Sequence, residues 1–432
     1  MAETAAAAVS VQPLDGSMRM LLLPDIAAKL ALGWKAVRVP EGVSVMRTRD
    51  DAVVMNEADF DLCRKVAERI VASGLSPVDP SGIIEACGMA RKMIVAEVFA
   101  PGTVRVLYYP SITRASAFYR CLLPSLTLNR GDKARAFVSK ALVAREAVDY
   151  DVVVIQIDHS AASFQFASAL KSLGKKVVYE IDDAFDQMEE WHPRWKLYRR
   201  PEVRDSVFRM MELADAVVVP TRYLADRYAG RTRRVVVIPN MIDVAGWPVK
   251  VVRPGPFRIL WAGSPSHEGD LAVAKDALLA LGKQYPSFRF TFFGHMPEWA
   301  AQLSGQADFI DFVPFEEYPV RYAQIGADVV IAPLADIPFN RAKSPIRLME
   351  AGASGYAVVA SKVGTYAEVG EDTIPLCVST DDWVQAVEAI HLNPEFRSVV
   401  ESRTGWIADR FDSNLESNRK IIEDFFVTLI GR

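Results

Sequence analysis

From residue 104 onward, the chain alternates short, almost wholly apolar runs with longer segments of helical periodicity. The first such runs are at 104–109, 152–157, 175–181, 216–220 and 235–239. Continuous Val and Ile runs that alternate with helices are typical of parallel strands covered on both faces. The pattern therefore predicts a doubly wound α/β unit.

A second series of the same kind follows a Pro-rich stretch. Residues 243–256 contain three prolines and two glycines, which predicts a linker. Strands are expected beyond it at 258–261, 289–293, 309–312, 329–332, 357–360 and 374–377, and helices at 270–285, 317–324, 345–352 and 380–390. We therefore predict two tandem Rossmann-like domains, 104–247 and 248–412. Helices are also expected at 394–411 and 413–430, and the C-terminal helix, 413–432, is expected to cross back.

Residues 1–103 do not show this alternation of apolar strands and helices. We expect a flexible Ala-rich tail at 1–18 and an α+β appendage at 19–103. In the appendage, the sequence indicates a hairpin from 34–40 and 43–47, a third strand at 52–55, and helices at 59–73 and 82–99. This region shows no evident chemistry, which favours a structural or partner-docking role over acceptor recognition.

Charge and cysteine content limit which kinds of partner and which cellular location the sequence favours. The 432 residues hold 50 Lys and Arg against 54 Asp and Glu, which argues against a strongly basic nucleic-acid binder. Residues 104–250 alone carry +6, from 23 basic and 17 acidic residues. This favours an anionic or membrane-surface acceptor, and a basic but merely solvated surface is left open. Four widely spaced cysteines and no apolar run of about 18 residues predict a cytoplasmic protein; peripheral attachment at the inner membrane face is left open.

The segment 339–368, FNRAKSPIRLMEAGASGYAVVASKVGTYAE, carries the densest set of chemical groups. Ser344 is a favourable N-cap and Pro345 suits a first helical turn, so we expect a helix to start there. The N-terminus of a helix presents free N–H groups to a phosphate, and Lys343 adds a full positive charge. Glu350 lies about two turns along, where its carboxylate can accept hydrogen bonds from a ribose diol.

This segment resembles the donor-site signature of retaining glycosyltransferases of the GT-B fold, family 4-like, which reads F-x(3)-K-S-x(2)-R/K-x-x-E-x-x-A-x-G. Other stretches resemble the same family in the same order: 175–186, 214–228, 235–243, 259–272 and 327–334. The resemblance covers about residues 104–430. It implies an α/β GT-B fold, in which two Rossmann-like domains flank a cleft. It also implies transfer of a sugar from a UDP- or GDP-sugar to an acceptor hydroxyl with retention, no cofactor and no essential metal.

The resemblance also implies donor-side roles. Glu350 would bind the ribose hydroxyls, Lys343 would offset the diphosphate charge, and His267 would touch either phosphate or sugar. The remaining donor-binding candidates are Gly263, Ser264, Asn340, Arg341, Ser344 and Arg347.

Residues that follow the strands of the first domain are expected at the cleft, because ligands bind at the carboxyl ends of parallel strands. Ser111, Arg114 and Arg120 are the acceptor-binding candidates, and Tyr119 could join them. The catalytic candidates that join Lys343 are Asp182, Asp183 and His159. An aspartate pair can suggest a metal, but we interpret Asp182 or Asp183 as orienting the acceptor hydroxyl or the donor sugar. A helix cap or turn carboxylate is the structural alternative.

Two departures from the family pattern keep other functions open. Many relatives carry E-x(7)-E, and Ala342 stands where the first Glu is expected. Glu268 precedes Gly269 in the phosphate loop, where relatives often have Lys-Gly. These departures leave open a catalytically weak GT-B protein that binds or scaffolds. The basic middle segment leaves open a glycosyltransferase that modifies nucleic acid. No pattern of an epimerase or phosphorylase is evident.

Overall fold

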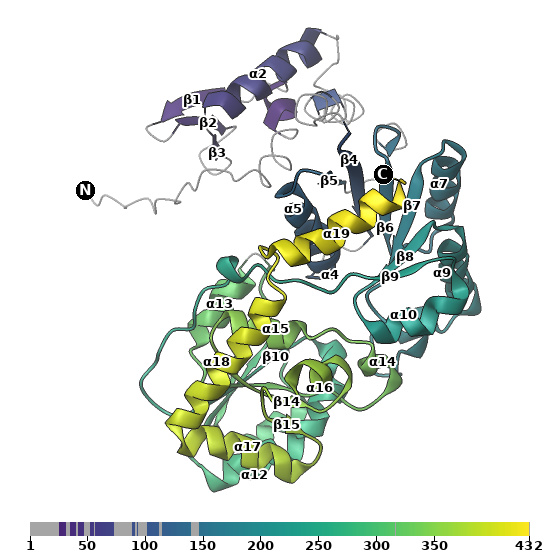
Figure 1. Ribbon diagram of the computed structural model, residues 1–432. Helices are drawn as coiled ribbons and strands as arrows, with labels where there is room; N and C mark the ends of the chain where they lie inside the picture. Colours follow the sequence, from purple (N-terminus) through teal and green to yellow (C-terminus); the bar gives the residue numbers. More distant parts are fainter. Residues whose placement is uncertain are drawn as a thin grey trace.

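The computed structural model describes residues 26–31, 35–39, 42–46, 52–55, 57–72, 89–90, 93, 102–111, 115–139, 147–315 and 317–431. These residues form two α/β lobes, each built on a six-stranded sheet, and a smaller N-terminal unit (Figure 1). The predicted tail 1–18, most of the predicted helix 82–99 and Arg114 lie outside the described residues.

The first lobe contains a wholly parallel sheet in the order β5-β4-β6-β7-β8-β9. Its strands are β4 (Val104–Pro110), β5 (Ala134–Val138), β6 (Val152–Gln156), β7 (Lys176–Glu180), β8 (Ala216–Val219) and β9 (Val235–Val237). All five residues of β6 are buried, as expected of a strand covered on both faces. The edge strand β5 was not predicted, because Arg135 interrupts its apolar run.

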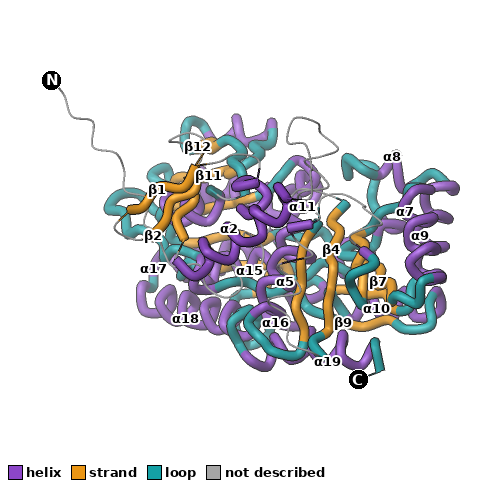
Figure 2. Tube along the Cα trace, turned by 90° about the horizontal axis from the view of Figure 1, so that it is seen from above, coloured by secondary structure: helices purple, strands orange, loops and turns teal. Residues whose placement is uncertain are grey.

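Helices cover both faces of this sheet. They are α4 (Ala115–Ala117), α5 (Leu123–Asn129), α7 (Ala161–Ser172), α8 (Trp195–Tyr198), α9 (Pro201–Leu213) and α10 (Arg222–Tyr228). A π-helical turn, η1 (Phe118–Leu122), joins α4 to α5. Side-chain caps fix two starts: Ser160 accepts a hydrogen bond from the N–H of Ser163, and Thr221 accepts one from Leu224. Figure 2 shows α7 and α9 side by side outside the strands.

The second lobe has a parallel sheet in the order β12-β11-β10-β13-β14-β15. Its strands are β10 (Arg258–Ala262), β11 (Arg289–Phe293), β12 (Ala307–Ile310), β13 (Val329–Ala332), β14 (Ala357–Ser361) and β15 (Leu376–Cys377). The strand order reverses between β10 and β13, and ligands of doubly wound sheets bind at such a switch point. The two parallel sheets confirm the predicted α/β class.

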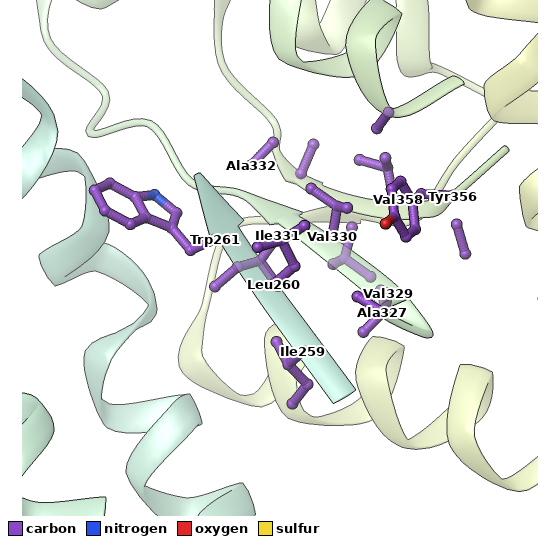
Figure 3. Close-up of a cluster of buried hydrophobic side chains, with 14 of the residues drawn as sticks. Ile259, Leu260, Trp261, Ala327, Val329, Val330, Ile331, Ala332, Tyr356 and Val358 are labelled. Carbon is purple, nitrogen blue, oxygen red and sulfur yellow. The ribbon is translucent and has the colours of Figure 1, made fainter. Parts of the chain in front are cut away.

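The core of this lobe lies where β10 and β13 meet. Ile259 and Leu260 of β10 and the Val and Ile side chains of β13 belong to one core cluster, with Tyr356 at one side and the ring of Trp261 at the other (Figure 3). Trp261 is only 1% exposed although it lies near the carboxyl end of its strand. Its ring therefore provides a rigid support beneath the loop that follows β10.

The helices of the second lobe are α11 (Glu268–Leu271), α12 (Lys275–Gln284), α13 (Tyr318–Ile325), α14 (Pro338–Arg341), α15 (Ile346–Ala353), α16 (Gly364–Gly370), α17 (Thr380–Leu392) and α18 (Pro394–Arg410). Gly355, at φ +74°, follows the end of α15. Gly352 lies inside α15 and admits α18, since a Cβ there would come 2.2 Å from the carbonyl oxygen of Thr404.

The chain passes between the lobes twice, and the two crossings are bonded to each other. The N–H of Ile242 donates to the carbonyl of Phe411 at 3.0 Å, and the N–H of Ser413 donates to the carbonyl of Ile242 at 2.8 Å. After this point α19 (Glu416–Leu429) returns to the first lobe, where Phe425 and Phe426 join its core (Figure 1). The helices expected at 394–411 and 413–430 therefore form, and the second does cross back.

The N-terminal unit is a three-stranded antiparallel sheet with a helix. Its elements are β1 (Lys35–Val39), β2 (Gly42–Met46), β3 (Ala52–Met55) and α2 (Glu57–Ala72). The predicted hairpin, third strand and first helix are confirmed. Cys63, Val66 and Ile70 of α2 pack with Ile26 in a small separate core. Throughout the described ranges, no helix is both long enough and apolar enough to cross a membrane.

Candidate active site

Loops from the carboxyl ends of both sheets meet between the lobes. Gly263 and Ser264 follow β10, while Asp182 and Asp183 follow β7 of the opposite lobe. Lys343 of the second lobe joins the two groups, because its Nζ donates to Oδ1 of Asp183 at 2.6 Å. Two predicted residues from opposite lobes, Lys343 and Asp183, are therefore in direct contact.

Lys343 is held firmly between α14 and α15. Its Nζ lies 4.4 Å from the centroid of the Phe339 ring, and its side chain is 19% exposed. The hydroxyl of Thr365 donates to the backbone carbonyl of Lys343. This support places the ammonium group beside Asp183 with little freedom to move.

The expected N-cap role of Ser344 is wrong. Helix α15 begins at Ile346 with Pro345 at the N-cap and no side-chain cap. The hydroxyl of Ser344 instead accepts a hydrogen bond from Nδ2 of Asn240, which belongs to the first lobe. The first N–H groups of α15 therefore have no hydroxyl cap, and Ser344 ties this helix to the opposite lobe.

The pKa values of Asp182 and Asp183 are shifted in opposite directions. Burial and the neighbouring charge of Asp183 raise the pKa of Asp182 from 3.8 to about 6. Burial would also raise the pKa of Asp183, but the charge and hydrogen bond of Lys343 outweigh it and hold that pKa below its ordinary value. Near neutral pH, Asp183 is therefore an ionised partner of Lys343, and Asp182 can gain or lose a proton.

Glu350 is buried at the meeting of the two lobes. The hydroxyl of Tyr119, from η1 of the first lobe, donates to its Oε1 at 2.7 Å. The hydroxyl of Tyr318, from α13 of its own lobe, donates to its Oε2 at 3.2 Å. Burial raises the pKa of Glu350 from 4.5 to about 7, against these hydrogen bonds and the charge of Arg347. The predicted ribose carboxylate thus already binds two hydroxyl groups.

Glu350 should make stability depend on pH. The pKa of Glu350 in the folded state lies above its ordinary value, so the folded state binds a proton more tightly than the unfolded state does. Protonation of Glu350 therefore stabilises the folded state. This contribution is full below about pH 4.5 and is lost as pH rises through 7. Between pH 5 and 8 the free energy of unfolding of the wild type should fall by about 2–3 kcal/mol more than that of Glu350→Gln. Urea unfolding at several pH values measures this, and parallel curves for the two proteins would contradict it.

Gly263, in the loop after β10, lies against two neighbouring side chains. A Cβ on Gly263 would come 2.6 Å from the Trp261 ring and 2.8 Å from Nη2 of Arg347, so only glycine fits. The guanidinium of Arg347 lies 5.6 Å from the Trp261 ring centroid. Its Nη1 is buried and has no hydrogen-bond partner among the described residues. A buried cation without a partner beside a glycine loop is suited to a phosphate.

Three further donor-side residues form one network in the second lobe. Nδ1 of His267 lies 2.9 Å from Oδ2 of Asp270, and Nδ2 of Asn340 donates to Oδ1 of the same carboxylate. Asp270 is 3% exposed. The side chain of Asn340 is therefore hydrogen-bonded to Asp270, and one ring nitrogen of His267 is held by the same carboxylate.

The remaining predicted residues lie in varied settings. Arg120 is 3% exposed, and it donates to Glu180 at 2.6 Å and to Asn240 at 2.8 Å. Burial raises the pKa of Glu180 to about 8, against the charge of Arg120. These contacts favour a structural role for Arg120; acceptor binding stays a prediction.

Of four other predicted residues, two are exposed and two are half-buried. Ser111 is exposed after β4, and Arg341 lies at the surface, paired with Asp336 at 2.8 Å. Nδ1 of His159 is buried without a partner in the part of the chain that is described. Ser264 shares a hydrogen bond of 2.6 Å with Ser266.

Sequence reasoning missed several members of the site. Asn240, Asp270 and Tyr318 each contact a predicted residue, but none had been given a role in binding. Tyr119 was expected near the acceptor and contacts Glu350 instead. A signal existed for Asn240, which stands in the family-like stretch 235–243; Tyr318 lies in no such motif.

Trp191 also contributes to the meeting of the lobes. Its ring, from the loop before α8, lies against Gly269, where a Cβ would come 2.6 Å from it. Within the described residues, no three His, Cys, Asp or Glu side chains gather as metal ligands.

Two family models match the sequence. Residues 86–245 match the model described as Glycosyltransferase Family 4, and residues 256–393 match the model described as Glycosyl transferases group 1. Together the matches span well over half of the chain, one for each lobe. No curated protein sequence matches the chain.

Solved structures share the fold. HepE of Anabaena, in complex with UDP-glucose, is 16% identical with a TM-score of 0.52, over 75% of this chain and 99% of that one. Sucrose-phosphate synthase from Thermosynechococcus elongatus is 14% identical with a TM-score of 0.53, over 75% and 99%. A glycosyltransferase from Rickettsia africae is 12% identical with a TM-score of 0.50, over 76% and 99%. At these identities the likeness shows the fold alone.

Proposed function

Because this chain belongs to the glycosyltransferases of the GT-B fold, family 4-like, we propose that it transfers a sugar from a nucleotide sugar to an acceptor hydroxyl with retention of configuration. The observation that carries the donor assignment is a cation beside the glycine loop: Nη2 of Arg347 would lie 2.8 Å from a Cβ on Gly263, and its buried Nη1 has no partner among the described residues. Lys343 reaches the meeting of the lobes, where it pairs with Asp183. Positive charge without a partner suits a diphosphate.

In the proposed reaction, the bond between the sugar carbon and the diphosphate oxygen breaks, a bond to the acceptor oxygen forms, and the proton of the acceptor hydroxyl passes to the leaving diphosphate. Negative charge grows on the leaving diphosphate, where Lys343, Arg347 and the free N–H groups of α15 offset it. Asp182 or Asp183 orients the acceptor hydroxyl or the donor sugar on the same face. The proposal includes no cofactor and no essential metal.

The nucleoside end of the donor is assigned to Glu350. A ribose diol would donate to this carboxylate, whose oxygens already accept from Tyr119 and Tyr318. Tyr318 belongs to the same lobe as Glu350, while Tyr119 comes from the opposite lobe. Donor binding is therefore expected to displace the hydroxyl of Tyr119 from Glu350. The complex of HepE with UDP-glucose supports UDP-glucose as the first donor to test.

The proposed acceptor is anionic or membrane-associated, a glycan or a lipid. The support is the charge of +6 carried by residues 104–250, which include the first lobe. The same charge favours a nucleic-acid acceptor as the alternative. Steeply salt-dependent binding of DNA would favour that alternative, and no binding in 50 mM salt would remove it.

Thermal unfolding in the presence of nucleotides tests the donor assignment. UDP or GDP should stabilise the protein by about 2.7 kcal/mol at a hundredfold excess over Kd, because a ligand that binds only the folded state shifts the unfolding equilibrium. The measurement is the melting temperature with millimolar nucleotide, with AMP as the control that lacks a diphosphate. If neither diphosphate shifts the melting temperature, the donor-site assignment fails.

A specific observation favours a second candidate, a catalytically weak binding protein. Ala342 occupies the position of the missing Glu, is 0% exposed, and packs in the apolar core of the first lobe. Its carbonyl accepts a hydrogen bond of 3.2 Å from the hydroxyl of Thr221 in the first lobe, so Ala342 takes part in a contact between the lobes. Slow hydrolysis of UDP-sugars separates the candidates: nucleotide binding without any sugar release would favour the weak binder.

A further inference from the structure

His267 has one ring nitrogen whose chemistry is fixed by its surroundings. Oδ1 of Asp270 accepts from Nδ2 of Asn340 and from the N–H of Ala335, the latter at 3.2 Å. Burial would raise the pKa of Asp270, but His267 and Arg347 outweigh it and keep that pKa below its ordinary value. An ionised carboxylate can only accept, so the hydrogen between Asp270 and His267 must sit on Nδ1 of the histidine.

With the hydrogen on Nδ1, the other ring nitrogen of His267, Nε2, can only accept a hydrogen bond. Burial, together with the charges of Arg347 and Lys343, lowers the pKa of His267 to about 4, so its ring is neutral. The side chain is 25% exposed, and the hydrogen bond that it makes to the described residues is through Nδ1. In a neutral ring with hydrogen on Nδ1, Nε2 carries a lone pair and no proton.

The charged side chains that act on this ring are donors. Lys343 and Arg347 both help to lower the pKa of His267, and neither side chain can accept a hydrogen bond. A diphosphate presents only acceptor oxygens, which match these donors and repel a lone pair. A sugar hydroxyl carries a proton, and it is the part of the donor that can bond to Nε2 while the cations hold the phosphates.

We propose that His267 accepts a hydrogen bond from a hydroxyl of the donor sugar through Nε2 and does not bind the diphosphate. Asp270 and Asn340 are positioning residues, because they fix the tautomer and the direction of the ring without touching the donor. This inference rests on the proposed function, and it makes His267 a residue that selects donors with a free hydroxyl at that position.

The test compares two ligands in the same protein sample. Dissociation constants are measured for UDP and for UDP-glucose, or for GDP and GDP-mannose if that pair binds the wild type more tightly. The variants are His267→Phe, which keeps the ring shape without an acceptor, and His267→Gln, whose amide can donate to Asp270 and still accept. The ratio of the two constants does not depend on how much protein is folded, so a loss of stability cannot imitate the result.

In His267→Phe the sugar nucleotide should bind about tenfold more weakly while the free diphosphate binds as before, and His267→Gln should restore much of the difference. Equal weakening of both ligands would overturn the inference and place His267 on the phosphates. Unchanged binding of both would remove His267 from the site. If the wild type binds no nucleotide at all, the proposed function itself fails, and this inference with it.

Discussion

Replacing Lys343 with alanine should lower the rate of sugar transfer about 10²–10³-fold while the protein still folds. In the proposed reaction its ammonium offsets the negative charge that grows as the diphosphate leaves, so its contribution should be greatest in the transition state. The structure adds that this side chain also pairs with Asp183 across the lobes at 2.6 Å. Turnover with the true donor and acceptor is the measurement, together with the melting temperature.

Lys362→Ala is the matched control for Lys343→Ala. Lys362 also lies in the second lobe, it is half exposed, and its pairing with Glu371 at 3.6 Å is far weaker. Its removal should be silent in both assays. Lys343→Arg should keep part of the activity, since it retains the charge. Normal turnover in Lys343→Ala would defeat the assignment and leave Arg347 or Arg341 as the phosphate partner.

Glu350→Gln should weaken nucleotide binding about 10- to 150-fold, because a hydrogen bond to a charged group contributes about 1.5–3 kcal/mol. Titration calorimetry with UDP or GDP measures the change. Asp186→Asn is the control for loss of a carboxylate: Asp186 accepts from Arg227 and from Tyr228 within the first lobe, away from the donor side. Equal effects of the two substitutions would remove Glu350 from the site.

A second variant tests the displacement of Tyr119. If the ribose must replace this hydroxyl on Glu350, then Tyr119→Phe should tighten nucleotide binding, since the competing donor is lost. Tyr318→Phe removes the hydroxyl of the same lobe and should not tighten it. Weaker binding in Tyr119→Phe would mean that this hydroxyl contributes to the bound state and does not compete with the nucleotide.

The sheets were predictable because local sequence alone defines most of their strands. Runs such as VVVIQ in β6 are apolar throughout, since both faces of the strand are covered. The edge strand β5 was missed for the opposite reason, because an edge strand tolerates Arg135. The spacing of Lys343 and Glu350 and the family resemblance also predicted a donor-binding segment, and that assignment stays a prediction.

The partners of these residues were not predictable from local sequence. Tyr119 and Glu350 are 231 positions apart, and only the docking of the lobes brings their side chains together. The same docking explains the error at Ser344. Its sequence context is that of an N-cap, but Asn240 of the opposite lobe bonds to its hydroxyl instead. A local preference of about 1 kcal/mol is easily outweighed by such a tertiary contact.

The bonded pair of crossings at Ile242 and Phe411 has a consequence for cooperativity. Because both crossings are fastened to each other at one point, rotation of the lobes about that point is the softest motion that the chain connections allow. A donor that bonds to Glu350 and Lys343 changes the groups that hold the lobes together, and so changes the preferred angle. Thermodynamic reciprocity then requires that an acceptor bound between the lobes alter donor affinity by the same factor by which the donor alters acceptor affinity.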